Sequence, residues 1–189
     1  MSIFSEKKQV REAIRAKRKA LPLAEKSLNS KCICKYLLTE LEKYPVGNLL
    51  SYIALKEEPD LMMAVKEAQK KGWGVYVPAL TRDLTMIAAQ YQEELEKTQL
   101  GFFQPKVVKP INPADISLYW IPGIAFGSKG YRLGMGGGFY DRFLEEKTGT
   151  LVGVGWSFQM LDTIPRESHD IRMNLLVNEK GVLETFKRF

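Results

Sequence analysis

The stretch Gly130-Tyr131-Arg132-Leu133-Gly134-Met135-Gly136-Gly137-Gly138-Phe139-Tyr140-Asp141-Arg142 holds five of the fifteen glycines of this 189-residue chain. It lies between an apolar run, 116–126, and a helix-like segment, 139–147. Glycines this dense occur where φ must be positive or where a ligand approaches the backbone closely. A strand, a glycine loop and a helix in this order point backbone N–H groups at an anion. The stretch therefore predicts a phosphate-binding loop, with a mobile surface loop as the alternative.

Charged and aromatic side chains accompany these glycines. Arg132, Tyr140, Asp141 and Arg142 place two cations, an aromatic ring and a carboxylate within about one helical turn of them. A low-complexity linker has no such side chains, so their presence favours a binding loop over a mobile one.

The segments on either side of the glycine stretch alternate between amphipathic and apolar runs. Helices are predicted over 6–21, 24–43 and 60–71, with Ser5 and Asp60 as N-caps and Pro22 and Gly72 as stops. Strands are predicted over 47–55, 73–77, 84–91, 118–121, 150–156, 175–177 and 182–186. The first two strands and the helix between them form a βαβ unit, which implies a parallel sheet covered by helices. Because no repeat or linker interrupts the chain, we predict one α/β domain over 1–189, with a mostly parallel sheet and helices on both faces.

The composition, 45% hydrophobic and 26% charged, is that of an ordinary soluble globular protein. No run approaches the roughly 20 apolar residues of a membrane span, and the first residues lack the apolar core of a secretory signal. We therefore expect a cytoplasmic protein with no membrane partner. Cys32 and Cys34 lie two apart in a predicted helix and point to different faces, so we expect no disulfide between them. A single histidine, His169, argues against a structural zinc site.

The net charge of +6 is concentrated in one segment, because residues 6–19 carry seven basic and two acidic groups. Lys7, Arg11 and Arg15 recur every four residues and form a cationic stripe on the first predicted helix. Such a stripe is usually a solvated face, and the alternative is a surface that attracts phosphates. Aromatic residues are not interleaved with these cations, so the sequence offers no base-stacking platform and we expect no nucleic-acid partner.

Two loops are predicted to face one crevice, because ligands of parallel sheets collect at the carboxyl ends of the strands. Segment 56–60 leaves the first strand, and segment 122–138 leaves the central strand. Glu58 is either a solvated helix-entry residue or the acceptor of a bidentate hydrogen bond from a ligand. Asp141 and Asp170 become candidate magnesium ligands if a nucleotide is bound, since Mg²⁺ on phosphates uses one or two carboxylates.

The longest motif in the chain resembles a family signature. Pro122-Gly-Ile-Ala-Phe126, followed by Gly130-x-Arg132-Leu-Gly-x-Gly-Gly-Gly-x-Tyr140-Asp-Arg-Phe-Leu144, is similar to the signature of the 5-formyltetrahydrofolate cyclo-ligases, also called 5,10-methenyltetrahydrofolate synthetases. The similarity covers nearly the whole chain, through Lys7-x-x-x-Arg11, Glu58-Pro-Asp60, Gln104-Pro105 and His169-Asp170. The resemblance implies a Rossmann-like α/β sandwich.

The resemblance also implies a reaction and a set of residues. The reaction is the ATP- and Mg²⁺-dependent conversion of 5-formyltetrahydrofolate, with or without a polyglutamate chain, to 5,10-methenyltetrahydrofolate, ADP and phosphate, carried out by a monomer. Tyr140 and Arg132 would be catalytic, and Asp141 and Asp170 would hold magnesium. The implied ATP-binding residues are Lys7, Arg11, Arg132, Gly134, Met135, Gly136, Gly137, Gly138 and Tyr140. The implied folate-binding residues are Ile53, Glu58, Met135, Gly136, Gly137, Gly138 and Phe139.

Three positions depart from the family pattern. Gly127 and Phe139 stand where an Asp and a Tyr are common, which affects the turn and the folate wall. Asn174 stands where an Asp is frequent, and it would be a weaker metal ligand. The alternatives to the ligase are another phosphate-handling enzyme of similar fold, such as a sugar-phosphate isomerase, and a small basic nucleic-acid-binding protein.

Overall fold

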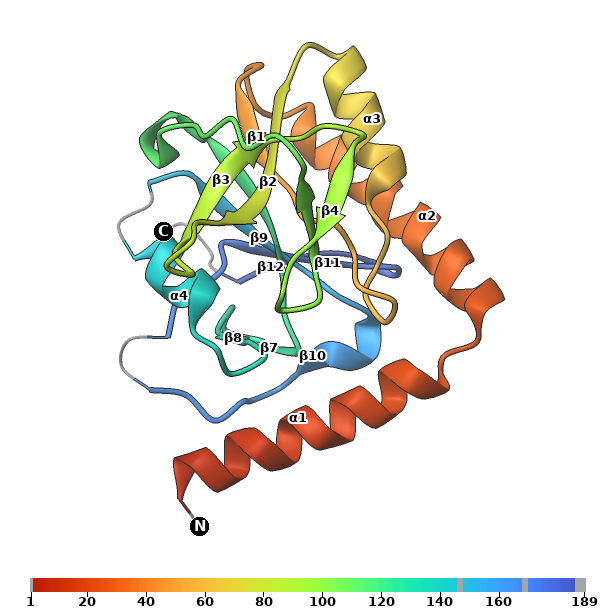
Figure 1. Ribbon diagram of the computed structural model, residues 1–189. Helices are drawn as coiled ribbons and strands as arrows, with labels where there is room; N and C mark the ends of the chain where they lie inside the picture. The colour runs from red at the N-terminus through yellow and green to blue at the C-terminus, as the bar shows by residue number, and fades with distance from the viewer. Residues whose placement is uncertain (1, 146–147, 168–169, 186–189) are drawn as a thin grey trace.

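The computed structural model describes residues 2–145, 148–167 and 170–185 (Figure 1). Its elements are α1 (Ile3–Ala20), α2 (Leu23–Leu41), β1 (Asn48–Leu50), α3 (Met62–Lys70), β2 (Gly74–Leu80), β3 (Met86–Gln90), β4 (Leu95–Lys97), β5 (Phe103–Pro105), β6 (Leu118–Pro122), β7 (Ala125–Gly127), β8 (Arg132–Leu133), α4 (Phe139–Leu144), β9 (Thr150–Val154), β10 (Met160–Leu161), β11 (Leu175–Asn178) and β12 (Gly181–Glu184). Short 3-10 turns lie at Pro113–Asp115 and Ser157–Gln159.

Seven strands form the main sheet in the order β12-β11-β9-β6-β1-β2-β3. The five inner strands pair in parallel, and the edge strands β12 and β3 pair antiparallel to their neighbours. Numbered along the chain, the parallel strands follow the order 2-1-3-4-5, which is a doubly wound order with its switch point between β1 and β6. The prediction of an α/β fold with a large, mostly parallel sheet is confirmed.

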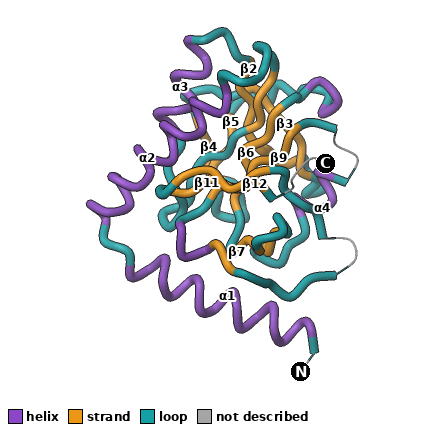
Figure 2. Tube along the Cα trace, turned by 180° about the vertical axis from the view of Figure 1, so that it is seen from behind, coloured by secondary structure: helices purple, strands orange, loops and turns teal. Residues whose placement is uncertain are grey.

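Strand β6 shows why the sheet is covered on both faces. Successive side chains of a strand point to opposite faces, and Tyr119 and Trp120 are both fully buried. Trp120 packs in the cluster that contains Leu37 of α2 and Val65 of α3, whereas Tyr119 packs with Phe143 of α4. Helices α2 and α3 therefore cover one face and the short α4 lies on the other, as the opposite views of Figures 1 and 2 show.

Helix α1 lies apart from the main sheet, at the bottom of Figure 1, along a small sheet of order β10-β7-β8. Its apolar residue Ile14 packs against Ile124, Ala125 and Leu133 of this region. None of the helices in the described residues is both long and apolar enough to cross a membrane. Cys32 and Cys34 are both free, as expected.

Several predicted boundaries were wrong. Helix α1 begins at Ile3 with Ser2 as its N-cap, because the Ser2 hydroxyl accepts a hydrogen bond from the Ser5 backbone N–H; Ser5 is therefore inside the helix. Helix α3 starts at Met62, although the predicted cap Asp60 does accept a hydrogen bond from the Met62 N–H.

Strand β1 is shorter than the strand predicted over 47–55, and strand β2 is longer than the strand predicted over 73–77. After β1 the Ser51 N–H still bonds to Tyr76, but the chain then turns away from the sheet, and the Tyr52 hydroxyl bonds to the Pro59 carbonyl. The apolar residues beyond Leu50 line a pocket instead of continuing a strand. Strand β2 runs on to Leu80 because β3 pairs with it.

Two hairpins were not predicted. Strands β7 and β8 lie between β6 and the glycine loop, so the apolar run 116–126 holds two strands, and the loop follows a hairpin rather than the central strand directly. Strands β4 and β5 form a separate two-stranded sheet. Both hairpins are made of strands of two or three residues, which are too short to show an alternating pattern.

Gly130 offers a test of this fold. Gly130 and Gly101 have nearly equal positive φ angles, +86° and +87°, but a Cβ on Gly130 would lie 2.5 Å from the Met173 carbonyl oxygen, whereas the Gly101 site is open. Substitution by Ala costs about 1–2 kcal/mol at both positions for the left-handed backbone. The clash adds about 1–3 kcal/mol for Gly130→Ala alone. Equal losses of unfolding free energy in urea would contradict this packing.

Candidate active site

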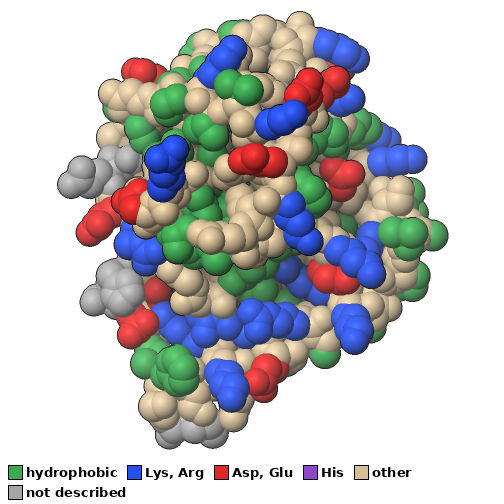
Figure 3. Space-filling model, in the orientation of Figure 1, with side chains coloured by type: hydrophobic (Ala, Val, Ile, Leu, Met, Phe, Trp, Pro, Cys, Tyr) green, Lys and Arg blue, Asp and Glu red, His purple; other side chains and the backbone are tan. Residues whose placement is uncertain are grey.

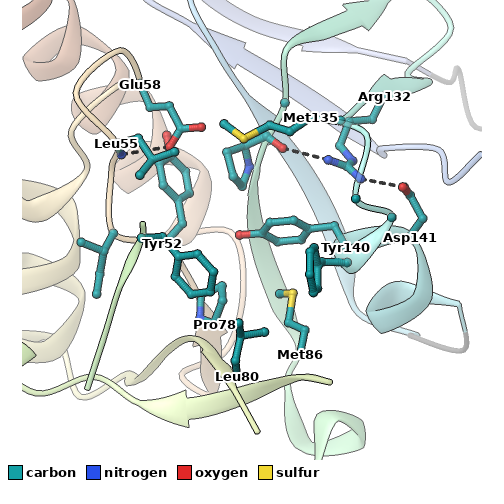
Figure 4. A pocket seen from close by; sticks show the side chains of 18 of the residues that line it. Tyr52, Leu55, Glu58, Pro78, Leu80, Met86, Arg132, Met135, Tyr140 and Asp141 are labelled. Atoms are coloured by element: carbon teal, nitrogen blue, oxygen red, sulfur yellow. Dashed lines mark hydrogen bonds and ion pairs between the residues drawn. The ribbon is translucent and has the colours of Figure 1, made fainter. Parts of the chain in front are cut away.

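A pocket with mostly apolar walls lies at the switch point of the sheet. It opens where the chain leaves the carboxyl ends of β1 and β6, which is where doubly wound sheets bind ligands. Its empty space, which includes the open mouth, is about 880 Å³. Its walls are Tyr52, Ile53, Leu55, Glu58, Pro78, Leu80, Met86, Phe102, Phe103, Pro122, Gly123, Arg132, Gly134, Met135, Gly137, Gly138, Phe139, Tyr140 and Asp141 (Figure 4).

Glu58 is a buried carboxylate on one wall of this pocket, only 8% exposed. Its Oε2 atom accepts a hydrogen bond from the Leu55 N–H at 3.1 Å, and its Oε1 atom lies 3.8 Å from Nη1 of Arg18. Burial raises the pKa of Glu58, while the Arg18 charge and the Leu55 hydrogen bond oppose that rise. The structure therefore excludes the alternative of a solvated helix-entry residue and leaves an acceptor group in an apolar cavity.

Arg18, which reaches this carboxylate from α1, is also buried, at 3% exposure. Its Nη2 atom donates to the Gly123 carbonyl, and its Nε atom is buried without a partner in the described residues. Sequence reasoning missed Arg18. The available signal was its position three residues after Arg15, which continues the cationic stripe.

Arg132 and Tyr140 occupy the opposite wall. Arg132 donates to Asp141 Oδ1 at 2.6 Å and to the Pro122 carbonyl at 3.2 Å, and its guanidinium carbon lies 5.3 Å from the centre of the Tyr140 ring. Burial and the Glu58 charge raise the pKa of Tyr140, and Arg132 only partly offsets them. The Tyr140 hydroxyl points across the pocket toward Tyr52 and stays protonated at neutral pH (Figure 4).

Two residues of the cationic stripe of α1, Arg11 and Arg15, reach the glycine loop, although Arg15 stays exposed. Nε of Arg11 donates to the Gly134 carbonyl at 2.9 Å, and Nη2 of Arg15 lies 3.5 Å from the Met135 carbonyl. Gly136, with φ +113°, lies beside the Arg11 guanidinium, about 3.8 Å from the position its Cβ would take. The solvated-face alternative is therefore wrong for most of the stripe.

Lys7, at the start of the stripe, is buried in a cluster of carboxylates. Its Nζ atom lies 2.8 Å from Oε2 of Glu167 and 2.9 Å from Oδ2 of Asp170. Burial alone would lower the pKa of Lys7, but its hydrogen bonds to Glu167 and Asp170 outweigh that effect and raise the pKa. The cluster joins the first helix to the segment before β11.

Most residues implied by the resemblance meet in the pocket. Those that line it are Ile53, Glu58, Arg132, Gly134, Met135, Gly137, Gly138, Phe139, Tyr140 and Asp141; Lys7, Arg11, Gly136 and Asp170 do not line it. The pocket also contains walls from β2, β3 and the β4–β5 hairpin that the sequence did not indicate, namely Pro78, Leu80, Met86, Phe102 and Phe103. Only Met86 of these five lies in a predicted strand, and only tertiary folding brings them together here.

The predicted metal ligands, Asp141 and Asp170, do not form a preformed metal-binding cluster. No group of three or more His, Cys, Asp or Glu side chains lies together in the described residues. Asp141 and Asp170 are each paired with a cation, Arg132 and Lys7, and His169 lies outside the described residues. Asp141 lines the pocket, and its Oδ2 atom accepts no hydrogen bond from the described residues.

The three residues that depart from the family pattern each make a defined contact in the structure. Asn174 Oδ1 accepts a hydrogen bond from the Leu151 N–H at 2.7 Å, so this side chain ties β9 to the start of β11. The Gly127 N–H donates to the Tyr131 carbonyl in the β7–β8 hairpin. Phe139 lines the pocket, and the guanidinium carbon of Arg142 lies 5.3 Å from the centre of the Phe139 ring.

A doubly wound sheet with a switch-point pocket that holds a buried carboxylate, an arginine and a protonated tyrosine defines a small-molecule α/β enzyme. More specifically, the chain belongs to the 5-formyltetrahydrofolate cyclo-ligase family, whose model matches residues 3–179. The prediction of the family and of the enzyme class is confirmed.

Relatives in sequence and structure agree with this membership. The chain is 28% identical over 176 residues to the 5-formyltetrahydrofolate cyclo-ligase of Haemophilus influenzae, covering 87% of this chain and 93% of that protein. It is 28% identical over 183 residues to the Escherichia coli enzyme, covering 90% and 99%. The structure of the Aquifex aeolicus 5,10-methenyltetrahydrofolate synthetase superposes with a TM-score of 0.79 at 28% identity, covering 97% and 94%. The Mycoplasma pneumoniae synthetase gives 0.78 at 26% identity, covering 92% and 99%.

The Arg18–Glu58 pair makes stability pH-dependent in a testable way. Removing one partner of a buried ion pair costs about 3–5 kcal/mol, because the other charge stays buried. A carboxyl whose pKa is raised by folding stabilises the protein at low pH, and this contribution is lost as pH rises through the folded pKa. Arg18→Met should therefore lose more unfolding free energy at about pH 8 than at about pH 4.

Urea unfolding across this pH range measures the effect. Glu58→Gln in the Arg18→Met background is the matched control, since it removes the charge and should remove the pH dependence. A loss from Arg18→Met that is the same at every pH would contradict the electrostatic role of the pair.

Proposed function

We propose that this protein catalyses the ATP- and Mg²⁺-dependent closure of 5-formyltetrahydrofolate to 5,10-methenyltetrahydrofolate, with release of ADP and phosphate. The observation that carries the proposal is the pocket in which Glu58 faces Tyr140 and Arg132 across apolar walls. Glu58 on one wall can accept hydrogen bonds from a flat heterocycle. Arg132 on the other wall supplies the positive charge that activation of an oxygen requires. Membership of the cyclo-ligase family supports the same reaction.

Glu58 is the group that recognises the pterin ring in this proposal. The amidine-like edge of a pterin presents two N–H donors, which match the two oxygens of a carboxylate. The Leu55 hydrogen bond and the Arg18 charge favour the ionised form of Glu58 and so oppose the rise in its pKa that burial causes. The apolar and aromatic side chains around it, Phe139 among them, then cover the faces of the ring.

Arg132 and Tyr140 act at the reacting centre. A formamide oxygen is a poor leaving group, so the formyl oxygen first attacks the γ-phosphorus of ATP, and ADP leaves. N10 then attacks the formyl carbon, its proton is released, and the oxygen departs with the phosphate. Arg132 stabilises the negative charge on the transferred group, and the Tyr140 hydroxyl, which keeps its proton, donates a hydrogen bond to the formyl or phosphoryl oxygen.

The N-terminal half of α1 and the glycine loop hold ATP in this proposal. Lys7 and Arg11 bind the phosphates, and the loop from Arg132 to Tyr140 wraps them. The nitrogens of Arg11 other than Nε make no hydrogen bond within the described residues, so they can turn to a phosphate. Lys7 exchanges its present carboxylate partners for phosphate oxygens.

The carboxylates of the site fit a magnesium ion that arrives with ATP, which needs one or two protein oxygens rather than a complete cage. Asp141 fits directly through its unbonded Oδ2 atom, and Asp170 fits once Lys7 moves to the phosphates. The ion would supply charge neutralisation on the phosphates.

We further propose that residues 1–189 act as one cytoplasmic, monomeric domain whose Rossmann-like sheet binds its ligands at the switch point. The substrate is 5-formyltetrahydrofolate with or without a polyglutamate chain. We propose no nucleic-acid or membrane partner, because Lys7, Arg11 and Arg18 point inward and are not a free cationic face.

The activity is tested with purified protein, 5-formyltetrahydrofolate, ATP and Mg²⁺. The absorbance of the methenyl product should rise, and it should not rise when ATP is omitted. Arg132→Lys, which keeps the charge but loses the forked geometry, should lower kcat by roughly ten- to hundred-fold. If the unaltered protein gives no rise in absorbance, the proposal is contradicted.

Lys7→Ala and Arg11→Ala test the nucleotide end. Each removes a charged hydrogen-bond donor worth about 1.5–3 kcal/mol, so the KM for ATP should rise about ten-fold or more while the folate KM changes less than about two-fold. Lys8→Ala is the control, because Lys8 is exposed and pairs only loosely with Glu12 at 3.9 Å. An ATP KM that is unchanged in both variants would place the nucleotide elsewhere.

A further inference from the structure

Trp156 is a fully buried side chain whose hydrogen bond reaches the loop that carries Glu58. It follows strand β9 and caps the 3-10 turn Ser157–Gln159. Its indole Nε1 atom donates to the Glu57 carbonyl at 3.2 Å. Strand β6 lies between β9 and β1 in the sheet, so Trp156 reaches past one strand to the loop that follows the next. Trp156 does not line the pocket, so any effect on the substrate passes through this loop.

The hydrogen bond from Trp156 completes the fixation of one peptide group. The Glu57 carbonyl and the Glu58 N–H belong to the same planar peptide. The Glu58 N–H donates to the Leu55 carbonyl at 2.9 Å, so both polar atoms of this peptide are held. The Cα atom of Glu58 is bonded to this peptide, and the side chain starts from that atom. The direction in which Glu58 enters the pocket therefore depends on Trp156.

Gln159 fixes Trp156 in turn. The Gln159 side chain is fully buried, and its Oε1 atom accepts a hydrogen bond from the Trp156 N–H at 2.8 Å. Its Nε2 atom donates to the carbonyls of Gly123 and Ile124 at 2.7 and 2.9 Å. Gly123 follows β6 and lines the pocket. Segment 156–159 therefore ties the loop after β1 to the loop after β6, which are the two loops of the switch point.

Filling the core is the alternative role for Trp156, and the chain contains a direct comparison. Trp120 of β6 lies in the same apolar cluster and is also fully buried. The Nε1 atom of Trp120 has no hydrogen-bond partner in the described residues. A tryptophan of this cluster is therefore packed without an indole hydrogen bond, and the bond from Trp156 to a pocket loop is not a requirement of packing.

Surface charges are another means of holding this loop. Figure 3 shows a band of Lys and Arg side chains between α1 and the strands above it. The Glu57 carboxylate pairs with one lysine, Lys26 of α2, at 2.5 Å. Several rotatable bonds separate this carboxylate from the backbone, so the ion pair leaves the peptide after Glu57 free to turn. Only the bond from Trp156 acts on the carbonyl of that peptide.

We propose that Trp156 is a positioning residue for the folate substrate, because its indole N–H holds the peptide before Glu58 in the orientation that meets the pterin. This inference rests on the proposed function. Without the N–H the peptide takes several orientations, and only the fraction of molecules with the native one binds. The apparent affinity falls in proportion to that fraction. ATP, which we place along the first half of α1, does not depend on this peptide.

Trp156→Phe tests the proposal, with Trp120→Phe as the matched control. Both variants remove the same atoms from the same cluster, but only Trp156→Phe removes an N–H that has a partner. The KM for 5-formyltetrahydrofolate, and its Kd without ATP, should rise roughly three- to ten-fold in Trp156→Phe, which is one hydrogen bond expressed as affinity. kcat and the ATP KM should change less than about two-fold, as should every constant of Trp120→Phe.

Two further variants separate positioning from packing. In the Glu58→Gln background, Trp156→Phe should change the folate Kd less than about two-fold, because the carboxylate that Trp156 positions is already lost. Replacement of Trp156 by benzothienylalanine puts sulfur in place of the indole N–H and keeps the ring size. This variant leaves no cavity and should raise the folate KM as much as Trp156→Phe does.

Four results would overturn the inference. They are an unchanged folate KM in Trp156→Phe, an equal rise in Trp120→Phe or in the ATP KM, an undiminished effect in the Glu58→Gln background, and a normal folate KM with benzothienylalanine. An unaltered protein that neither binds nor converts the folate would instead contradict the proposed function, and this inference would fall with it.

Discussion

The site depends on hydrogen bonds from the cations of α1 to the backbone carbonyls of the loops that form the pocket. The glycine loop has few side chains with which to pack, and glycines lose more conformational entropy on folding than other residues. Arg11 holds the Gly134 carbonyl and Arg18 holds the Gly123 carbonyl, so charged donors fix backbone that apolar contacts cannot. Arg18 then extends this contact to Glu58, and the same helix that shapes the loop also sets the charge of the pocket.

Helix α1 therefore places positively charged side chains along the whole length of the site. Its start, at Lys7, lies among Glu167 and Asp170, where we place the phosphates of ATP. Its middle bonds to the glycine loop, and its end reaches Glu58. An anionic folate and an anionic nucleotide would repel each other in one cavity. Arg11 and Arg18, which are held by loop carbonyls, would lower that repulsion in the proposed arrangement.

The sequence predicted those parts of the fold and site that depend on local chemistry. The glycine loop was recognisable from residue type alone, and the long α2 was placed within two residues at either end. The apolar run 116–126 contained the predicted strand β6 but hid a second one, β7, because both strands are buried and hydrophobicity does not change at the turn between them. Arg18 resembled any surface cation, since its burial comes from contacts across the fold. Leu80 and Met86 pair on the consecutive strands β2 and β3, and Phe103 comes from β5; no local pattern shows that these strands lie at the pocket.

The central claim is that the pocket activates the formyl oxygen by phosphorylation before the ring closes. An ¹⁸O label in the formyl group of the substrate tests it most directly, through mass spectrometry of the phosphate released in one turnover. The account predicts one ¹⁸O atom in each phosphate formed, because the formyl oxygen departs with phosphorus. Phosphate without the label, with ¹⁸O found in water instead, would contradict it.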